Sequence, residues 1–170
     1  VLLRQKVVKV DNKEKTVVLD DGSKITYEYL INTSPLNHFL ECFDEDAFKK
    51  LKDELSYNKV LVFNLGFNKK SKYDKEHWMY IPDKNVNFYR IGFYDNILDA
   101  DKLSMYIEIG YGKNDVITDE DVERQLKLTL ENLQKLGITD EETILEEHST
   151  IIMDPAYVRS EEHTSELQSL

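Results

Sequence analysis

The chain has 170 residues, of which 41% are hydrophobic, and a formal net charge of −11 at pH 7. This length allows one domain and part of a second, and the apolar content is sufficient for a buried core. The acidic balance argues against nucleic acid as a partner, because phosphates require a basic surface, whereas a small anionic ligand needs only one or two well-placed cations.

The sequence also bears on disulfide bonds, membrane-spanning helices, metal sites and dinucleotide sites. The single cysteine, Cys42, excludes an internal disulfide bond and is typical of a reducing compartment, so we expect a cytoplasmic protein. No apolar run of about 18 residues occurs, so no membrane-spanning helix is predicted. The histidines lack metal-ligand spacing, and the scattered glycines form no G-x-G-x-x-G fingerprint for a dinucleotide.

The first 35 residues predict a β-meander of three strands. Residues 7–10 and 16–19 flank a polar loop, and Asp21-Gly22 is a strong turn signal because glycine accepts a positive φ. Residues 25–31 are expected to form the third strand. Three strands are not stable alone, so we expect them to belong to a larger domain.

Residues 36–158 predict an α+β domain, an antiparallel sheet with flanking helices. A short helix is expected after Pro35 and a second one from Asp44. A long helix is expected from Thr118, where a capping-box pattern stands, to Gly137, with one apolar stripe. Apolar alternation predicts the strands, over residues 57–68, 78–81, 87–94, 103–111 and 143–153.

The strands at 78–81 and 87–94 carry the candidate binding site. Alternate residues share a face of a strand, so Trp78 and Tyr80 point one way, and Phe88, Arg90, Gly92 and Tyr94 share a face of the next strand. We expect Tyr80 to pair with Phe88 and Trp78 with Arg90.

That face would combine aromatic rings with one guanidinium, and Gly92 would leave open space above the backbone. Arginine suits phosphate, because its planar fork donates two hydrogen bonds at once, and aromatic rings suit a base or a sugar. No carboxylate is expected beside Arg90, and Glu108 is expected on a solvated face. Ordinary packing of the aromatic residues remains the alternative.

Residues 27–36 resemble a junction in FAD-dependent flavoproteins of the amine oxidase, protoporphyrinogen oxidase and UDP-galactopyranose mutase superfamily. There a meander of the Rossmann-like FAD-binding domain leads into the substrate domain. The resemblance implies that residue 1 lies within a longer protein, that residues 1–35 come from the FAD-binding domain, and that the phosphate-binding turn for FAD precedes this chain.

Residues 77–83 and 88–90 are similar to the W-x-Y-f-P-e … p-F-Y-R segment of UDP-galactopyranose mutases. The resemblance implies that Trp78 and Tyr80 line the substrate pocket and that Arg90 holds the UDP diphosphate. Tyr157 would approach the diphosphate, although Val158 stands where that family has proline. No catalytic residue and no FAD-contacting residue is identified.

The resemblance implies a flavin-dependent mutase acting on a UDP-sugar, with a non-redox ring contraction that needs reduced FAD. Two alternatives stay open: an FAD-dependent oxidoreductase of the protoporphyrinogen oxidase or amine oxidase type, and a non-catalytic module that binds nucleotide sugars. Residues 159–170 have no apolar rhythm and resemble a translated sequencing adapter, so we expect a non-native tail there.

Overall fold

The computed structural model describes residues 2–160, which form two compact units. One unit contains the described residues up to Tyr57 together with those from Tyr157 onwards, and the other is Asn58–Ala156. The predicted fold class is confirmed, since the chain contains antiparallel sheets of three and five strands with flanking helices. The predicted domain boundary at residue 35 stays a prediction.

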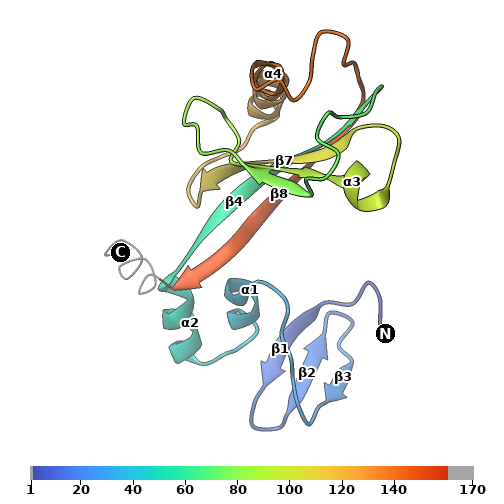
Figure 1. Ribbon diagram of the computed structural model, residues 1–170. Helices are drawn as coiled ribbons and strands as arrows, with labels where there is room; N and C mark the ends of the chain where they lie inside the picture. Colours follow the sequence, from blue (N-terminus) through green and yellow to red (C-terminus); the bar gives the residue numbers. More distant parts are fainter. Residues whose placement is uncertain (1, 161–170) are drawn as a thin grey trace. The chain divides into compact units, whose positions relative to one another are not determined.

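The first unit contains the predicted meander, β1 (Val7–Asp11), β2 (Thr16–Leu19) and β3 (Lys24–Thr26), paired in that order (Figure 1). Gly22 adopts a φ of +82° in the turn before β3, as the Asp-Gly pattern predicts. The third strand is shorter than expected. Thr26 pairs with Thr16, the first residue of β2, so no partner residue remains in β2 for residues 27–31.

Two short helices, α1 (Leu36–Leu40) and α2 (Asp46–Asp53), complete this unit. The first begins after Pro35 as predicted, whereas the second begins two residues later than the expected Asp44. Phe43, between them, stacks on Phe48 with ring centres 4.3 Å apart and meets Phe39 edge to face. With Val10 and Val17 these rings form the small core of the unit.

The second unit is dominated by the five-stranded sheet, in the order β5-β6-β7-β4-β8. Its strands are β4 (Leu55–Phe67), β5 (Trp78–Tyr80), β6 (Arg90–Phe93), β7 (Ser104–Gly112) and β8 (Leu145–Ser160). The last strand does not end at Met153 as expected. It is an edge strand, so Pro155 can lie within it without breaking a ladder between two neighbours.

Two helices belong to the second unit. The first, α3 (Tyr94–Leu98), begins where the sequence predicted strand, so Tyr94 is helical and not the last residue of β6. The second, α4 (Asp119–Lys135), begins with the predicted capping box, in which the Thr118 hydroxyl accepts from the Asp121 backbone and the Asp121 carboxylate accepts from the Thr118 backbone. Gly137 follows the helix with a φ of +65°.

The core of the second unit lies between α4 and one face of the sheet (Figure 1). The apolar stripe predicted for α4 is confirmed, because Val122, Leu126, Leu130, Leu133 and Leu136 all pack there. The odd-numbered strand residues supply the other side. They include Leu61, Phe63, Leu65, Ile91, Phe93, Met105, Ile107 and Ile109, all nearly inaccessible to solvent.

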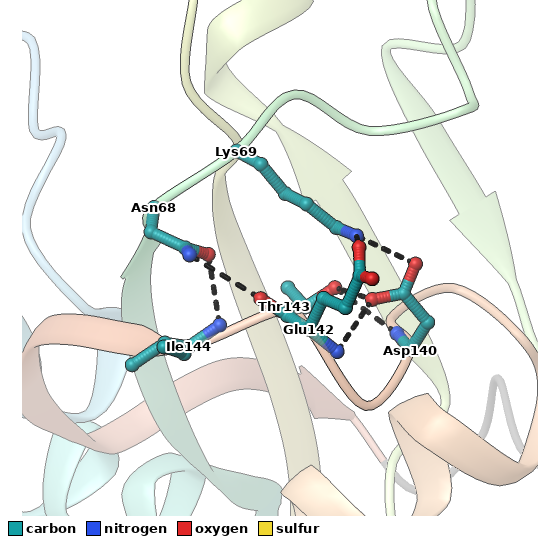
Figure 2. A network of polar contacts seen from close by, with 6 residues as sticks. All are labelled: Asn68, Lys69, Asp140, Glu142, Thr143 and Ile144. Carbon is teal, nitrogen blue, oxygen red and sulfur yellow. Dashed lines mark hydrogen bonds and ion pairs between the residues drawn. The ribbon is translucent and has the colours of Figure 1, made fainter.

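A polar network fastens the loop between α4 and β8 to the end of β4 (Figure 2). The Lys69 ammonium contacts Asp140 at 2.7 Å and Glu142 at 3.4 Å. Asp140 also accepts from the Glu142 backbone and from the Thr143 hydroxyl, so its carboxylate organises the loop itself. Asn68 exchanges hydrogen bonds with the Glu142 carbonyl and the Ile144 amide, which aligns β8 with β4.

Candidate functional site

Three of the four predicted site residues, Trp78, Tyr80 and Arg90, lie on the sheet face opposite the α4 core, as their even numbering requires. The strand register places them in two rows across the sheet, Trp78–Gly92–Tyr106–Asn64 and Tyr80–Arg90–Glu108–Val62. We call Trp78, Tyr80, Arg90, Tyr106 and Glu108 the aromatic–arginine face.

The expected register was wrong by two residues, because Trp78 pairs with Gly92 and Tyr80 with Arg90. Phe88, the expected partner of Tyr80, precedes β6 and is buried with Ile91 and Phe93 in the α4 core. A shift by two keeps each side chain on its face, so the grouping of Trp78, Tyr80 and Arg90 is retained while their neighbours change.

Arg90 is held between two tyrosine rings. Its guanidinium carbon lies 6.0 Å from the centre of the Tyr80 ring and 5.7 Å from that of Tyr106. In such cation–π contacts the face of each ring attracts the positively charged guanidinium. The side chain is 24% exposed, so Arg90 is partly accessible while its orientation is constrained from both sides.

Glu108 corrects two expectations about this site. It is only 4% exposed and not solvated, and it is the carboxylate partner of Arg90 that the sequence did not predict. Arg90 Nη2 donates to Glu108 Oε1, and the Tyr89 hydroxyl donates to Glu108 Oε2. A buried carboxylate is costly unless it is paired and hydrogen-bonded, and both conditions are met here.

The electrostatics of the pair keep Arg90 charged. Burial by itself lowers the pKa of Arg90, but its interactions with Tyr80 and Glu108 outweigh burial and raise the pKa above its ordinary value. Burial also raises the pKa of Tyr106, although the charge of Arg90 opposes this. The face therefore presents a permanent guanidinium beside the neutral phenol of Tyr106 at neutral pH.

The space above Gly92 is filled and not open as predicted. A Cβ at this position would lie 1.8 Å from the nearest atom of the Tyr106 ring, so that ring lies directly on the glycine backbone. Tyr94, at the start of α3, continues the surface, with its ring centre 5.2 Å from that of Tyr106 and its hydroxyl donating to Asn64. Glycine is required here because any larger residue would displace Tyr106.

The accessible part of the face is aromatic. Trp78 and Tyr80, on the edge strand β5, are 60% and 61% exposed, so a large part of each side chain is accessible to a ligand. Tyr157, the fourth predicted residue, lies on β8 in the other unit and is half exposed. Its approach to a diphosphate stays a prediction.

Sequence reasoning missed Tyr89, Tyr106 and Glu108. The alternation in β7 already placed Tyr106 and Glu108 on one face, but it did not show which strand lies beside β7. That β6 and β7 are neighbours, with Arg90 opposite Glu108, is a fact of the topology. Tyr89 reaches the same carboxylate from the segment just before β6.

The described residues do not supply a phosphate cradle for a dinucleotide. Such a cradle needs a glycine-rich turn between a strand and a helix. The glycines lie instead in the β2–β3 turn, within β4, β6 and β7, and after α4. No cluster of three or more metal-ligating side chains occurs within residues 2–160, and no helix in that range is long and apolar enough to cross a membrane.

Solved structures resemble this chain throughout most of its length. A reduced UDP-galactopyranose mutase superposes with a TM-score of 0.74 at 18% identity, covering 89% of this chain and 35% of the mutase. An oxidoreductase from Methanosarcina mazei gives a TM-score of 0.62 at 13% identity, covering 89% of this chain and 37% of that protein. A fatty acid isomerase from P. acnes gives 0.53 at 15% identity, covering 86% and 34%.

At these identities the structural matches establish a shared fold, and this chain spans about a third of the length of each protein. The sequence profile of the flavin containing amine oxidoreductases matches residues 1–154. That match covers most of the chain, so the chain belongs to the flavin containing amine oxidoreductase family.

Proposed function

We propose that the protein containing this chain is an FAD-dependent mutase that acts on a UDP-sugar, and that the aromatic–arginine face binds the nucleotide part of this substrate. The observation that carries the proposal is the position of Arg90, a partly accessible guanidinium fixed between two tyrosine rings beside the exposed Trp78. The fold shared with a UDP-galactopyranose mutase supports it.

The chemistry of the face suits a nucleoside diphosphate. Arg90 commits Nη2 to Glu108 and retains other N–H donors, which could hydrogen-bond to phosphate oxygens. The exposed rings of Trp78 and Tyr80 offer flat apolar surfaces for a base or a sugar. In this proposal Arg90 holds the charged part of the substrate and the two rings orient the rest.

When bound, reduced flavin supplies the electron-rich ring system that a ring contraction without net oxidation requires. Residues 2–160 contain no glycine-rich cradle for its phosphates, so the role proposed for this chain is substrate binding and orientation. The FAD site would then be formed by residues outside the aromatic–arginine face.

Binding of UDP to the complete gene product, measured by calorimetry, tests the proposal. A charge-assisted hydrogen bond contributes roughly 1.5–3 kcal/mol, so Arg90→Ala should weaken UDP binding about tenfold to a hundredfold. Arg90→Lys should recover only part of the affinity, because an ammonium lacks the planar fork.

Arg124→Ala is the matched control, since Arg124 is a well exposed arginine on α4, paired with Asp121. It should leave the affinity unchanged, and melting curves should show that all three variants fold. UDP binding by Arg90→Ala as tight as that of the wild type would remove Arg90 from the proposed site.

A second candidate is an oxidoreductase with an uncharged or amine substrate. The observation that favours it is the ion pair itself, because Glu108 already balances the charge of Arg90. If the wild type binds neither UDP nor uridine, the oxidoreductase replaces the mutase as the proposed function. Flavin reduction by a panel of amines would then be the measurement to make.

A further inference from the structure

The Arg90–Glu108 pair has two physical consequences for a ligand at the aromatic–arginine face. Glu108 fixes the guanidinium, since its two oxygens accept from Arg90 and from Tyr89 on neighbouring parts of the sheet. Its charge also opposes the attraction of Arg90 for an anion. The first consequence favours anion binding by pre-organisation, and the second weakens it.

The burial of Glu108 decides how strongly its charge acts. The residue is 4% exposed, so water screens it poorly, while Arg90 remains partly accessible. Among the five residues of the aromatic–arginine face, Arg90 is the only cation and Glu108 the only carboxylate. The formal charges of the Arg90–Glu108 pair therefore oppose each other, and an approaching anion meets an oriented dipole.

We propose that Glu108 is a positioning residue and a charge regulator of the anion site, which rests on the proposed function of Arg90. It holds Arg90 in the slot between Tyr80 and Tyr106, and it keeps the affinity for multiply charged ligands moderate. The site then discriminates by hydrogen-bond geometry and ring contact more than by charge alone, which suits a site that must release a nucleoside diphosphate or its sugar.

Two substitutions separate these roles. In Glu108→Gln the amide oxygen still accepts from Arg90 and the amide nitrogen can donate to the Tyr89 oxygen, so the geometry is retained while the charge is lost. In Glu108→Leu both the anchor and the charge are lost. The glutamine variant should therefore gain affinity for an anion, whereas the leucine variant should bind it more weakly than the glutamine variant.

Calorimetry on the complete gene product with UDP and with uridine as the uncharged control gives the measurement. Glu108→Gln should bind UDP about tenfold more tightly than the wild type, with a steeper loss of affinity as salt is added, because the unbalanced guanidinium acts at longer range. Its affinity for uridine should be unchanged. Melting curves identify any variant that does not fold.

The possible results separate the two proposals. If the wild type binds UDP but Glu108→Gln leaves its affinity unchanged or weakens it, the charge-regulator role is wrong, while the role of Arg90 stands. If Glu108→Leu binds UDP as tightly as Glu108→Gln, the positioning role is wrong. If the wild type does not bind UDP, the proposed function fails, and inorganic pyrophosphate becomes the probe. Tighter pyrophosphate binding by Glu108→Gln than by the wild type then supports the inference, and its absence overturns it.

Discussion

The two faces of the five-stranded sheet use the same strands in different ways. The face under α4 consists of side chains such as Leu61, Phe63 and Ile107, which are fully buried against one another and against the helix. The opposite face carries an ion pair, tyrosine hydroxyls and the mostly exposed Trp78. The first face is stabilised by burial of apolar surface, and the second by specific interactions between pairs of side chains.

This difference explains how each face tolerates change. Apolar packing is non-directional, so truncation of a residue on the α4 side costs stability roughly in proportion to the group removed. On the aromatic–arginine face the effect of a substitution depends on its partner, as with Gly92 and the Tyr106 ring. Substitutions on the two faces test this contrast.

The largest effect is expected from Phe63→Ala on the α4 side. Phe63 is completely buried, and its truncation leaves a cavity, so we expect a loss of about 3–5 kcal/mol in the free energy of unfolding. Trp78→Ala, on the other face, should change it by only about 0.5 kcal/mol, because Trp78 is mostly exposed. Urea titrations of both variants give the comparison, and equal losses would contradict it.

A smaller loss, about 1–3 kcal/mol, is expected for Gly92→Ala, because the new methyl group must displace the Tyr106 ring. Gly110→Ala is the matched control on the same face, where the nearest atom, on Tyr89, would lie 3.7 Å away in ordinary contact. In a Tyr106→Ala background the Gly92→Ala change should cost little. Similar costs with and without the Tyr106 ring would show that the ring is not the reason for the glycine.

Thr118→Ala should destabilise the protein by about 1 kcal/mol, the usual cost of losing an N-cap. The Thr118 hydroxyl accepts from the Asp121 backbone at the start of α4, so the helix that covers the apolar face loses a terminal hydrogen bond. Thr118→Ser retains the hydroxyl and should behave like the wild type in thermal melts. If the serine and alanine variants have the same melting temperature, the hydroxyl cap does not stabilise α4.

The smallest effect is expected from the network around Asp140. Hydrogen bonds from Lys69 and then from Thr143 lower the pKa of Asp140 to about 2, from an ordinary value of 3.8. Because the folded-state pKa is the lower one, the carboxylate contributes stability above about pH 4 and loses this contribution as the pH falls towards 2.

Thermal melts of Asp140→Asn should therefore lie below those of the wild type at neutral pH and converge with them in acid. Asp101→Asn, which removes an exposed carboxylate outside the network, serves as the control. A difference between Asp140→Asn and the wild type that persists unchanged at pH 2 would show that the ionised carboxylate is not what stabilises the loop.

The sequence by itself determined which way most strand residues face, although Phe88 was expected on the face of Arg90 and lies in the α4 core. Alternation in residues 57–68 and 103–111, the capping box at Thr118 and the apolar stripe of α4 are local signals, and all three are confirmed. These signals can be recognised in the sequence because the direction of each side chain is set by the period of the helix or strand to which it belongs. The same logic correctly grouped Trp78, Tyr80 and Arg90. The expected tail at 159–170 lies mostly outside the described residues, and the backbone of β8 continues to Ser160.

Only the tertiary structure decided which partners these residues have. A register shift of two residues leaves each side chain on the same face of its strand. The alternation of residues therefore did not show whether Arg90 lies opposite Tyr80, as it does, or opposite Trp78. The burial of Glu108 and the ring above Gly92 depend on β7 lying beside β6, and strand order is set by packing of the whole sheet. The charge balance of the candidate site follows from that strand order, because the residue that neutralises Arg90 is 18 positions away in the sequence.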